Sequence, residues 1–168
     1  SGKAADEEAV RASGVSYGIL RPTLVFGTED ILINNIAWLL RHFPIFAIPG
    51  DGRYRIQPIH VEDLARLAVE HGERQDNVVL DAVGPEIYTF DELVILLKRT
   101  VGSRAALIHV PPGLALTLAR IIGLFVGDVV LTPEEVDGLM SDLLVSDQTP
   151  NGSTRLSKWL AANRDLIG

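Results

Sequence analysis

Apolar residues recur at helical spacing in several segments of the chain. Between residues 61 and 68 they stand at i, i+3, i+4 and i+7, and Gly72 follows as a natural stop, which predicts an amphipathic helix. Two more helices are indicated by capping boxes at residues 89–92 and 132–135, where a threonine and a later glutamate satisfy free backbone amides. Further helices are expected over residues 3–12, from Asp30 to about Arg41, and from about Ser157 to Ile167.

Short apolar runs between these helices predict strands. Residues 15–20 run toward a proline that removes a backbone donor, and residues 78–82 lie between turn residues. Residues 53–59 are expected to be extended, and a further strand is considered at residues 106–110. Alternating strands and helices favour an α/β fold with parallel strands. Only two or three strands are convincing and no glycine-rich phosphate-binding loop is present, so we expect the second half of a larger fold.

Composition narrows the choice of partners. The chain carries 15 Lys and Arg against 22 Asp and Glu, a net charge of −7, which argues against nucleic acid as the main partner. The absence of cysteine excludes disulfides, thiolate metal sites and a cysteine nucleophile, and it suits the reducing cytoplasm. The most apolar stretch, residues 113–127, is too short to span a membrane and contains Arg120. We expect it to form a buried or half-buried helix, with a helix that lies on a membrane or docks on a partner as the alternative.

Few residue patterns point to chemistry by themselves. The four histidines show no metal-ligand spacing, so no metal site is expected, and no Gly-x-Ser-x-Gly motif supports acyl transfer. Asp63, beside a predicted helix start, is expected to cap that helix or favour its dipole, with direct chemistry as the alternative. His60 could line a cleft or pack in the structure, and Arg55 and Gln57 could contact a ligand or lie on a solvated strand face. From composition alone, Lys3 is an ordinary surface lysine.

Several sequence stretches, taken in their order and spacing, resemble a known family. Four of them are Lys3–Gly14, Ile19–Gly27, Pro49–Gly52 and Ile59–Ala65. Together they resemble the extended and atypical short-chain dehydrogenase/reductases, which form the NAD-dependent epimerase/dehydratase superfamily. Two later stretches are similar to the branch that includes the dehydrogenase-like accessory subunit of respiratory complex I, namely Leu131–Met140 and Thr154–Leu160.

The resemblance implies an α/β chain that is the C-terminal part of a Rossmann-type fold. It would hold two to three strands of that fold together with a helix-rich substrate-binding lobe. Residues 1–27 and 60–84 would belong to the nucleotide-binding fold, and residues 28–59 and 85–168 would form the small substrate-binding lobe.

The resemblance also implies roles for individual residues. Lys3 matches the lysine of the family's Tyr-x-x-x-Lys pair, which implies a catalytic and cofactor-binding role, and the tyrosine would precede Ser1 by two positions. Pro22 and Thr23 would lie against the nicotinamide of NAD or NADP. No glycine-rich turn and no residue that selects between these cofactors is found in the sequence.

Arg55, Gln57 and His60 are expected on the substrate side of the cleft. Family members that act on nucleotide sugars usually carry an arginine at the position of Ile56, where it meets the diphosphate. Isoleucine offers no guanidinium for that contact. A lipid-like or quinone-like ligand, or no turnover at all, is therefore expected in place of a nucleotide sugar.

Two functions follow from the resemblance. The first is the substrate-binding half of an NAD(P)-dependent oxidoreductase or epimerase, and the second is a non-catalytic, cofactor-binding scaffold or accessory subunit of a respiratory or membrane-associated complex. A small-molecule ligand is expected for the longer parent protein, in the cytoplasm or at the periphery of a membrane. The isolated chain is expected to be inactive, to bind no nicotinamide cofactor, and to self-associate through uncovered strands.

Overall fold

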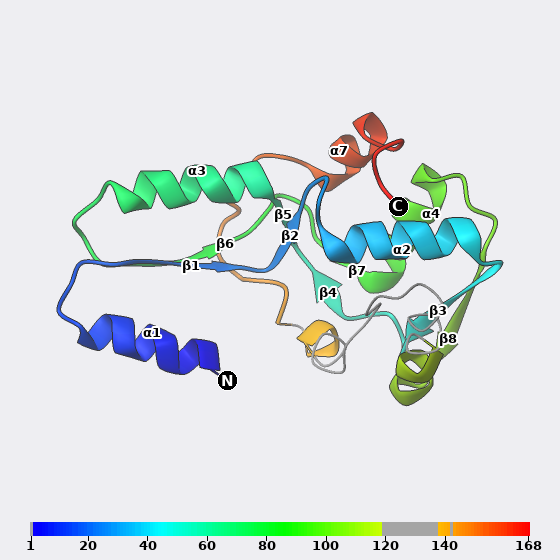
Figure 1. Cartoon of the computed structure of the whole chain (residues 1–168), viewed down its shortest axis with the longest axis horizontal. Coiled ribbons are helices and arrows are strands. Elements are labelled where there is room, and N and C mark those ends of the chain that lie inside the picture. The colour runs from blue at the N-terminus through cyan, green and yellow to red at the C-terminus, as the bar shows by residue number, and fades with distance from the viewer. Residues whose placement is uncertain (1, 119–137, 142) are drawn as a thin grey trace.

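Helices and strands alternate in the computed structural model, which describes residues 2–118, 138–141 and 143–168 (Figure 1). In chain order the elements are α1 (Gly2–Ala12), β1 (Gly18–Pro22), β2 (Leu24–Phe26), α2 (Ile31–His42), β3 (Ile45–Pro49), β4 (Arg55–Ile56), β5 (Pro58–His60), α3 (Val61–Gly72), β6 (Val78–Ala82), β7 (Tyr88–Thr89), α4 (Phe90–Thr100), β8 (Ala106–Val110) and α7 (Leu156–Ala162). Residues 112–118 and 138–140 are also helical. The predicted capping box at 132–135 and most of the apolar stretch at 113–127 lie outside the described residues.

The described strands pair two by two, and most of the pairs are parallel. β1 runs beside β6 with Gly18 opposite Val78, and β2 runs beside β5 with Phe26 opposite His60. β3 and β8 form a third parallel pair, whereas β4 and β7 are antiparallel. The predicted α/β fold with parallel strands is therefore confirmed.

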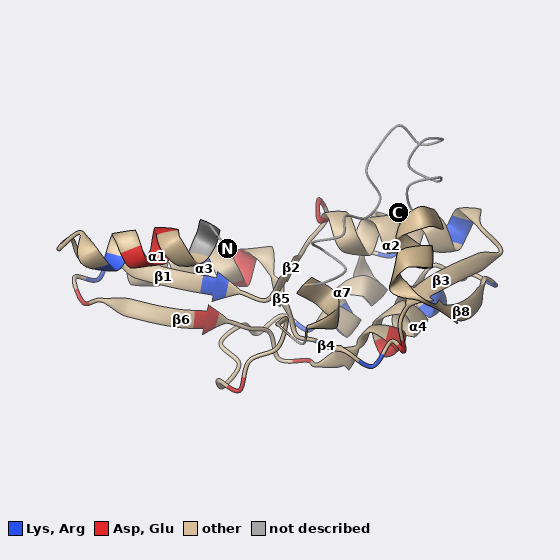
Figure 2. Ribbon diagram, turned by 90° about the horizontal axis from the view of Figure 1, so that it is seen from below, with Lys and Arg blue, Asp and Glu red and all other residues tan. Residues whose placement is uncertain are grey.

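One end of the molecule is a layered α/β unit. Figures 1 and 2 show α1 on one face of the β1–β6 pair and α3 on the opposite face. α3 closes a small core in which Leu67 packs with Ile59 and Ala82. α1 is tied to β1 by the Glu7 carboxylate, which accepts hydrogen bonds from Arg21 Nε at 2.8 Å and Nη2 at 2.6 Å.

The larger core lies at the other end, between α2, α4 and α7. The buried side chains that α2, α4 and α7 contribute to it come from positions spaced three or four apart, so each helix turns one apolar face inward. On α2 these are Ile33, Ile36, Ala37 and Leu40; on α4 they are Phe90, Leu93, Val94 and Leu97. Phe26 at the end of β2 packs into the same core, which fixes the loop that follows it.

Local signals placed several helix starts correctly. Asp30 caps α2, and Thr89 with Glu92 forms the predicted capping box of α4. Two boundaries differ from the prediction. β1 begins at Gly18 because Tyr17 N–H donates to the Asn77 side chain rather than to a strand, and α7 ends at Ala162, after which the chain turns toward Gly168.

Three short strands escaped the sequence analysis. β3 lies between Pro44 and Pro49, and it exists because β8, about sixty residues later, supplies its backbone partners. β2 contains three residues and β7 two, too few to show a clear alternation of polar and apolar side chains, whereas β4 falls within residues 53–59, which were expected to be extended. Of the helices that the structure describes, none has the length and apolar character that crossing a bilayer requires.

Candidate functional site

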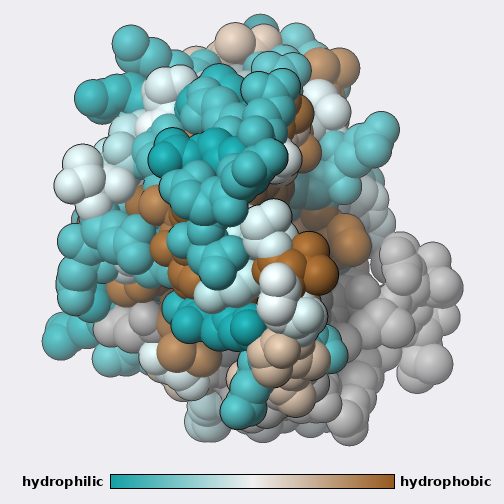
Figure 3. All heavy atoms as spheres, turned by 90° about the vertical axis from the view of Figure 1, so that its left-hand side faces the viewer, coloured by the Kyte–Doolittle hydropathy of each residue, from teal (hydrophilic) through white to brown (hydrophobic). Residues whose placement is uncertain are grey.

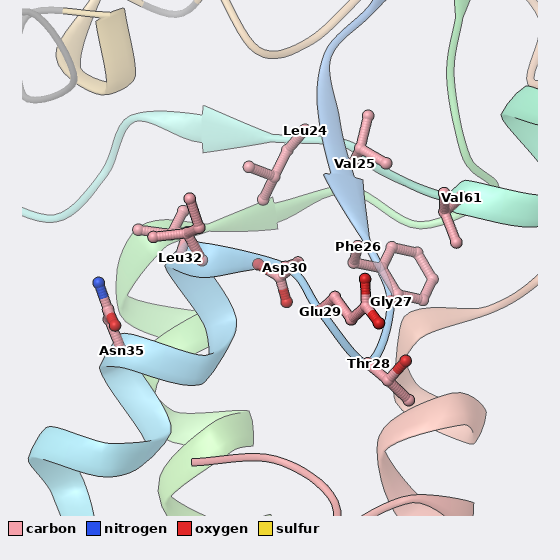
Figure 4. A pocket seen from close by; sticks show the side chains of 11 residues that line it. Leu24, Val25, Phe26, Gly27, Thr28, Glu29, Asp30, Leu32, Asn35 and Val61 are labelled. Atoms are coloured by element: carbon pink, nitrogen blue, oxygen red, sulfur yellow. The ribbon is translucent and has the colours of Figure 1, made fainter.

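A pocket of about 500 Å³ opens where β2 and β5 end and α2 begins (Figure 4). Its wall follows the chain continuously from β2 through the loop into α2, with Val61 of α3 closing it on another side. The carboxyl ends of parallel strands are where α/β proteins commonly bind ligands. The lining residues are Leu24, Val25, Phe26, Gly27, Thr28, Glu29, Asp30, Ile31, Leu32, Asn35 and Val61.

Asp30 is the chemically distinctive group of this pocket. Its Oδ1 accepts a hydrogen bond from Ile33 N–H at 2.9 Å, which caps α2, whereas its Oδ2 is buried with no hydrogen-bond partner among the described residues. Burial raises the pKa of Asp30 to about 6, although hydrogen bonds from the Ile33 and Leu32 backbone act in the opposite direction. A carboxyl group that titrates near neutral pH can both give and take a proton.

Sequence reasoning identified Asp30 only as a helix cap. The signal for more was present, because a carboxylate in a short loop between a strand end and a helix start lies where ligands bind in this fold class. What the sequence does not show is that one oxygen of Asp30 is buried without a hydrogen-bond partner among the described residues.

Pro22 and Thr23 stand at the end of β1, at the border of the pocket but not in its lining. Pro22 lies opposite Ala82 in the parallel pair. Thr23 N–H donates to the Ala82 carbonyl at 3.4 Å, and the Thr23 hydroxyl donates to the backbone carbonyl of Gln57. Their predicted contact with a nicotinamide stays a prediction.

Gln57 is 1% exposed and joins three segments of the chain. Its Nε2 donates to the Gly84 carbonyl at 2.9 Å, and its Oε1 accepts from Ser146 N–H at 3.2 Å. Its backbone N–H donates to the Leu144 carbonyl at 2.7 Å. Both ends of the side chain are thus engaged by the protein, which favours a structural role over the predicted contact with a substrate.

His60 packs in the structure, the second of the two roles considered for it. It is 7% exposed, and its Nδ1 accepts a hydrogen bond from Glu62 N–H at 3.3 Å, so His60 caps α3. Its ring lies edge-on to Phe26, with centroids 5.1 Å apart, and tilted against Trp159 at 5.9 Å. His60 precedes the pocket residue Val61, and its predicted role toward a substrate remains untested.

Asp63 has a function that the sequence did not reveal. It lies in the first turn of α3, as expected, but the cap of that helix is His60. The Asp63 carboxylate instead accepts hydrogen bonds from Ser153 N–H at 2.9 Å and from Thr154 N–H at 2.8 Å. Burial alone would raise the pKa of Asp63, but the hydrogen bonds from these two residues together outweigh it and hold the pKa at about 2.

The remaining predicted residues lie away from the pocket lining. Arg55 is exposed in β4, opposite Thr89. Lys3 lies in the first turn of α1, and α1 is the helix on the far side of β1 from α3 (Figure 1). Within residues 2–118, 138–141 and 143–168, no three acidic or histidine side chains converge in a way that could hold a metal ion.

Known proteins that are similar to this chain include subunits of NADH dehydrogenase and a reductase. No protein-family model matches it. It is 25% identical over 156 residues to NADH dehydrogenase [ubiquinone] 1 alpha subcomplex subunit 9, mitochondrial, of Arabidopsis thaliana, covering 86% of this chain and 39% of that protein. It is 28% identical over 154 residues to the ceramide reductase of Caulobacter vibrioides, covering 90% and 48%.

A solved structure shows the same fold. The UDP-glucuronic acid 4-epimerase of Bacillus cereus, in complex with NAD, superimposes with a TM-score of 0.59 at 17% identity, covering 99% of this chain and 48% of that one. The chain resembles the NAD-dependent epimerase/dehydratase superfamily, as its motifs predicted. The matches to subunits of NADH dehydrogenase also confirm the predicted complex I branch. This chain spans less than half the length of each of these curated relatives.

Proposed function

We propose that this chain is the C-terminal, ligand-binding part of a longer NAD(P)-dependent oxidoreductase or epimerase of this superfamily. The observation that carries the proposal is the pocket at the carboxyl ends of β2 and β5. The carboxyl group of Asp30, whose pKa burial raises to about 6, is one of its lining groups. Residues 1–27 and 60–84 would complete the nucleotide-binding fold, and residues 28–59 and 85–168 would form the substrate lobe. The fold of an epimerase that binds NAD supports this division.

The open edge of β1 supports a longer parent protein. β6 is covered on its outer edge, where Asn151 Nδ2 donates to the Asp81 carbonyl at 2.7 Å and Gln148 Oε1 accepts from Asp81 N–H at 3.4 Å. β1 pairs with β6, and no other described strand pairs with it. The missing strands of a Rossmann-type sheet would pair with this edge of β1.

The exposure of β1 and β6 also supports a longer parent protein. Parallel strands with helices on both faces are normally buried, yet Ala82 alone is buried among the residues of β1 and β6. Seen from this end, apolar atoms show between the hydrophilic surfaces (Figure 3). Val10 and Val15, in and after α1, are 42% and 67% exposed. Together with the exposed strands, this surface would suit contact with further protein.

The cofactor is proposed to be NAD or NADP, held mainly by the part of the parent protein that carries the glycine-rich loop. From this chain, Lys3 would orient the nicotinamide ribose and lower the pKa of a tyrosine, while Pro22 and Thr23 would lie against the nicotinamide. The group supplies hydride transfer when it is bound. Asp30, in the pocket at the ends of β2 and β5, would hold or move a proton of the ligand.

Nicotinamide binding by the whole gene product tests this proposal. We expect fluorescence titrations to give micromolar binding of NADH or NADPH to the product read from its natural start, and negligible binding to the chain alone. Lys3→Met in the whole product should weaken binding by roughly tenfold, the loss of one charge-assisted contact. Lys98→Met on α4 is the matched control and should bind as the unmodified protein does. Micromolar binding to the chain alone would contradict the proposal.

A second candidate is a cofactor-binding, non-catalytic accessory subunit of a respiratory or membrane-associated complex. The observation that favours it is the similarity to NADH dehydrogenase subunits of Arabidopsis thaliana and Dictyostelium discoideum, at 25% and 29% identity. The codon two positions before Ser1 in the gene separates the two candidates. Tyrosine there favours catalysis, and a side chain that cannot exchange a proton favours the accessory subunit.

Self-association of the isolated chain follows from the open edge of β1. Two copies could pair through these edges and cover the half-buried residues of both. Sedimentation equilibrium at micromolar concentrations should show dimers or larger species, and Gly18→Pro, which removes a backbone donor from the open edge of β1, should reduce them. A chain that stays monomeric over this range contradicts the idea.

The location in the cytoplasm, or at a membrane periphery, stays a proposal.

A further inference from the structure

A second cavity adjoins the pocket and has a different chemistry. Its volume is about 440 Å³, which is in the range of small-molecule sites. It lies between α2, β3 and β8, with side chains of residues 115, 118 and 139 on one side. Asn35 is the one polar side chain among the described lining residues, which are Leu32, Asn35, Ile36, Leu39, Phe43, Ile45, Phe46, Ala47, Pro49, Phe90, Ile108, Ala115, Leu118 and Leu139.

The two cavities meet on the same turn of α2. Leu32 and Asn35 line both of them, so the pocket that contains Asp30 and the apolar cavity share this part of their wall. Figure 4 shows both residues on the first turns of α2, next to the loop that carries Glu29 and Asp30. A single molecule with a polar end and an apolar end would therefore fit along α2 with each end in the cavity that suits it.

The carboxyl groups in the pocket that contains Asp30 restrict the polar end of such a molecule. Its lining includes the carboxyl groups of Glu29 and Asp30, and no lysine or arginine lines either cavity among the described residues. Carboxylates accept hydrogen bonds from hydroxyl and amide groups, but they repel phosphates and carboxylates. An anionic head group would be desolvated here without a cation to compensate it.

We propose that this chain binds a neutral amphiphile, with one hydrocarbon chain in the apolar cavity and a hydroxyl- or amide-bearing head group beside Asp30. None of the described residues that line the apolar cavity is charged, so it selects for hydrocarbon by burial of apolar surface. This inference deepens the proposed function, because it takes the pocket that contains Asp30 as the ligand site and names the class of substrate.

A series of probes with one chain and three head groups tests the proposal. Monodecanoylglycerol, decanoic acid and decyl phosphate are titrated into this chain by calorimetry, below the concentrations at which they form micelles. We expect monodecanoylglycerol to bind with micromolar affinity, and the two anions to bind roughly tenfold more weakly or worse, because each brings a charge that no cation among the described lining residues pairs. Equal affinities for all three, or no binding of monodecanoylglycerol, would overturn the proposal.

Two variants check that binding occurs in the apolar cavity. Ile108→Asp places a charge in its wall, and Ala47→Phe fills part of it; both should lower the affinity for monodecanoylglycerol by roughly tenfold. Ile108 is 42% exposed, and Val69, on α3 and away from both cavities, is 63% exposed, so Val69→Asp is the matched control. Unchanged affinity in both cavity variants would overturn the proposal even if the amphiphile binds.

The outcomes keep this inference and the proposed function apart. Amphiphile binding is measured on this chain without a nucleotide, whereas nicotinamide binding is measured on the whole gene product. Amphiphile binding without nicotinamide binding supports the cavity site and overturns the oxidoreductase. Nicotinamide binding without amphiphile binding leaves the proposed function and overturns the neutral amphiphile as its substrate class.

Discussion

The Asp63 carboxylate binds Ser153 twice, accepting hydrogen bonds from its backbone N–H at 2.9 Å and from its hydroxyl at 3.1 Å. Thr154 N–H donates a third hydrogen bond, and Arg66 Nη2 lies 3.5 Å from Oδ1 of the same carboxylate. Asp63 belongs to the first turn of α3, and Ser153 lies just before α7. The contact therefore ties the layered α/β end of the molecule to the segment that leads into the helix of the larger core.

Asp63→Asn should destabilise the chain, because an amide can accept at one oxygen only and places a second donor against the backbone N–H groups. We expect the free energy of unfolding at neutral pH to fall by about 2 kcal/mol. Guanidinium chloride titrations measure it. Glu70→Gln on the same helix is the control; its carboxylate contacts Arg66 at 3.0 Å at the surface, so the change should be within about 1 kcal/mol.

The effect of Asp63 should also depend on pH. Its pKa is about 2 in the folded chain, below the ordinary value of 3.8, so the unfolded chain takes up a proton first as the pH falls. The stability that it contributes is complete above pH 3.8 and is lost as the pH falls through about 2. The difference between the unmodified chain and Asp63→Asn should therefore shrink in this range, and a constant difference would contradict this account.

Asp30 should show the opposite dependence. Its pKa is raised from 3.8 to about 6, so the folded chain favours the protonated form and loses stability as the pH rises through about 6. Asp30→Asn keeps a good cap for α2 but carries no charge. Between acidic and neutral pH, we expect the stability of this variant to rise by roughly 3 kcal/mol relative to that of the unmodified chain. Asp165→Asn, at a side chain that is 88% exposed, should follow the unmodified chain in pH-dependent thermal denaturation.

Gln57→Met should be costly although the two side chains are similar in size. The variant leaves the Gly84 carbonyl and Ser146 N–H without their side-chain partners in a buried place. We expect a loss of about 2 kcal/mol in the free energy of unfolding. Gln75→Met, at an exposed position in a loop, should cost much less. A small loss at Gln57 would show that water replaces the missing contacts.

Gly84 should tolerate no side chain. A Cβ atom built there would collide with the backbone carbonyl of Pro58, which cannot move without disturbing β5. Gly72 at the end of α3 has open space around the same position. Gly84→Ala should therefore unfold at a clearly lower denaturant concentration. We expect its free energy of unfolding to fall by about 3 kcal/mol or more. Gly72→Ala should be neutral or slightly stabilising, and equal effects of the two changes would refute the steric explanation.

The helices could be predicted because their signals are local. The capping box of α4 lies within four residues, and the apolar stripe of α3 recurs at each turn. β3 could not be predicted in the same way, since its backbone partners come from β8. The role of Asp63 was missed for the same reason, because its partners Ser153 and Thr154 lie 90 and 91 residues further along the chain.

The candidate site was only partly within reach of sequence reasoning. The order of motifs indicated the superfamily, and Pro22 and Thr23 were placed correctly at the end of a strand. The pocket itself was not anticipated, and neither was the buried, unpaired oxygen of Asp30. Burial depends on which distant segments cover a group, and a residue pattern carries no information about that.

By itself, the sequence determined where the main helices begin, that the strands are parallel and alternate with them, and which superfamily the motifs resemble. Local hydrogen bonds and apolar periodicity act within a turn or two, so they can be read along the chain. The tertiary structure alone decided that Gln57 and Asp63 join segments, that Asp30 titrates near neutral pH, and that two cavities meet on α2. Each of these properties arises when residues far apart in sequence exclude water from one another.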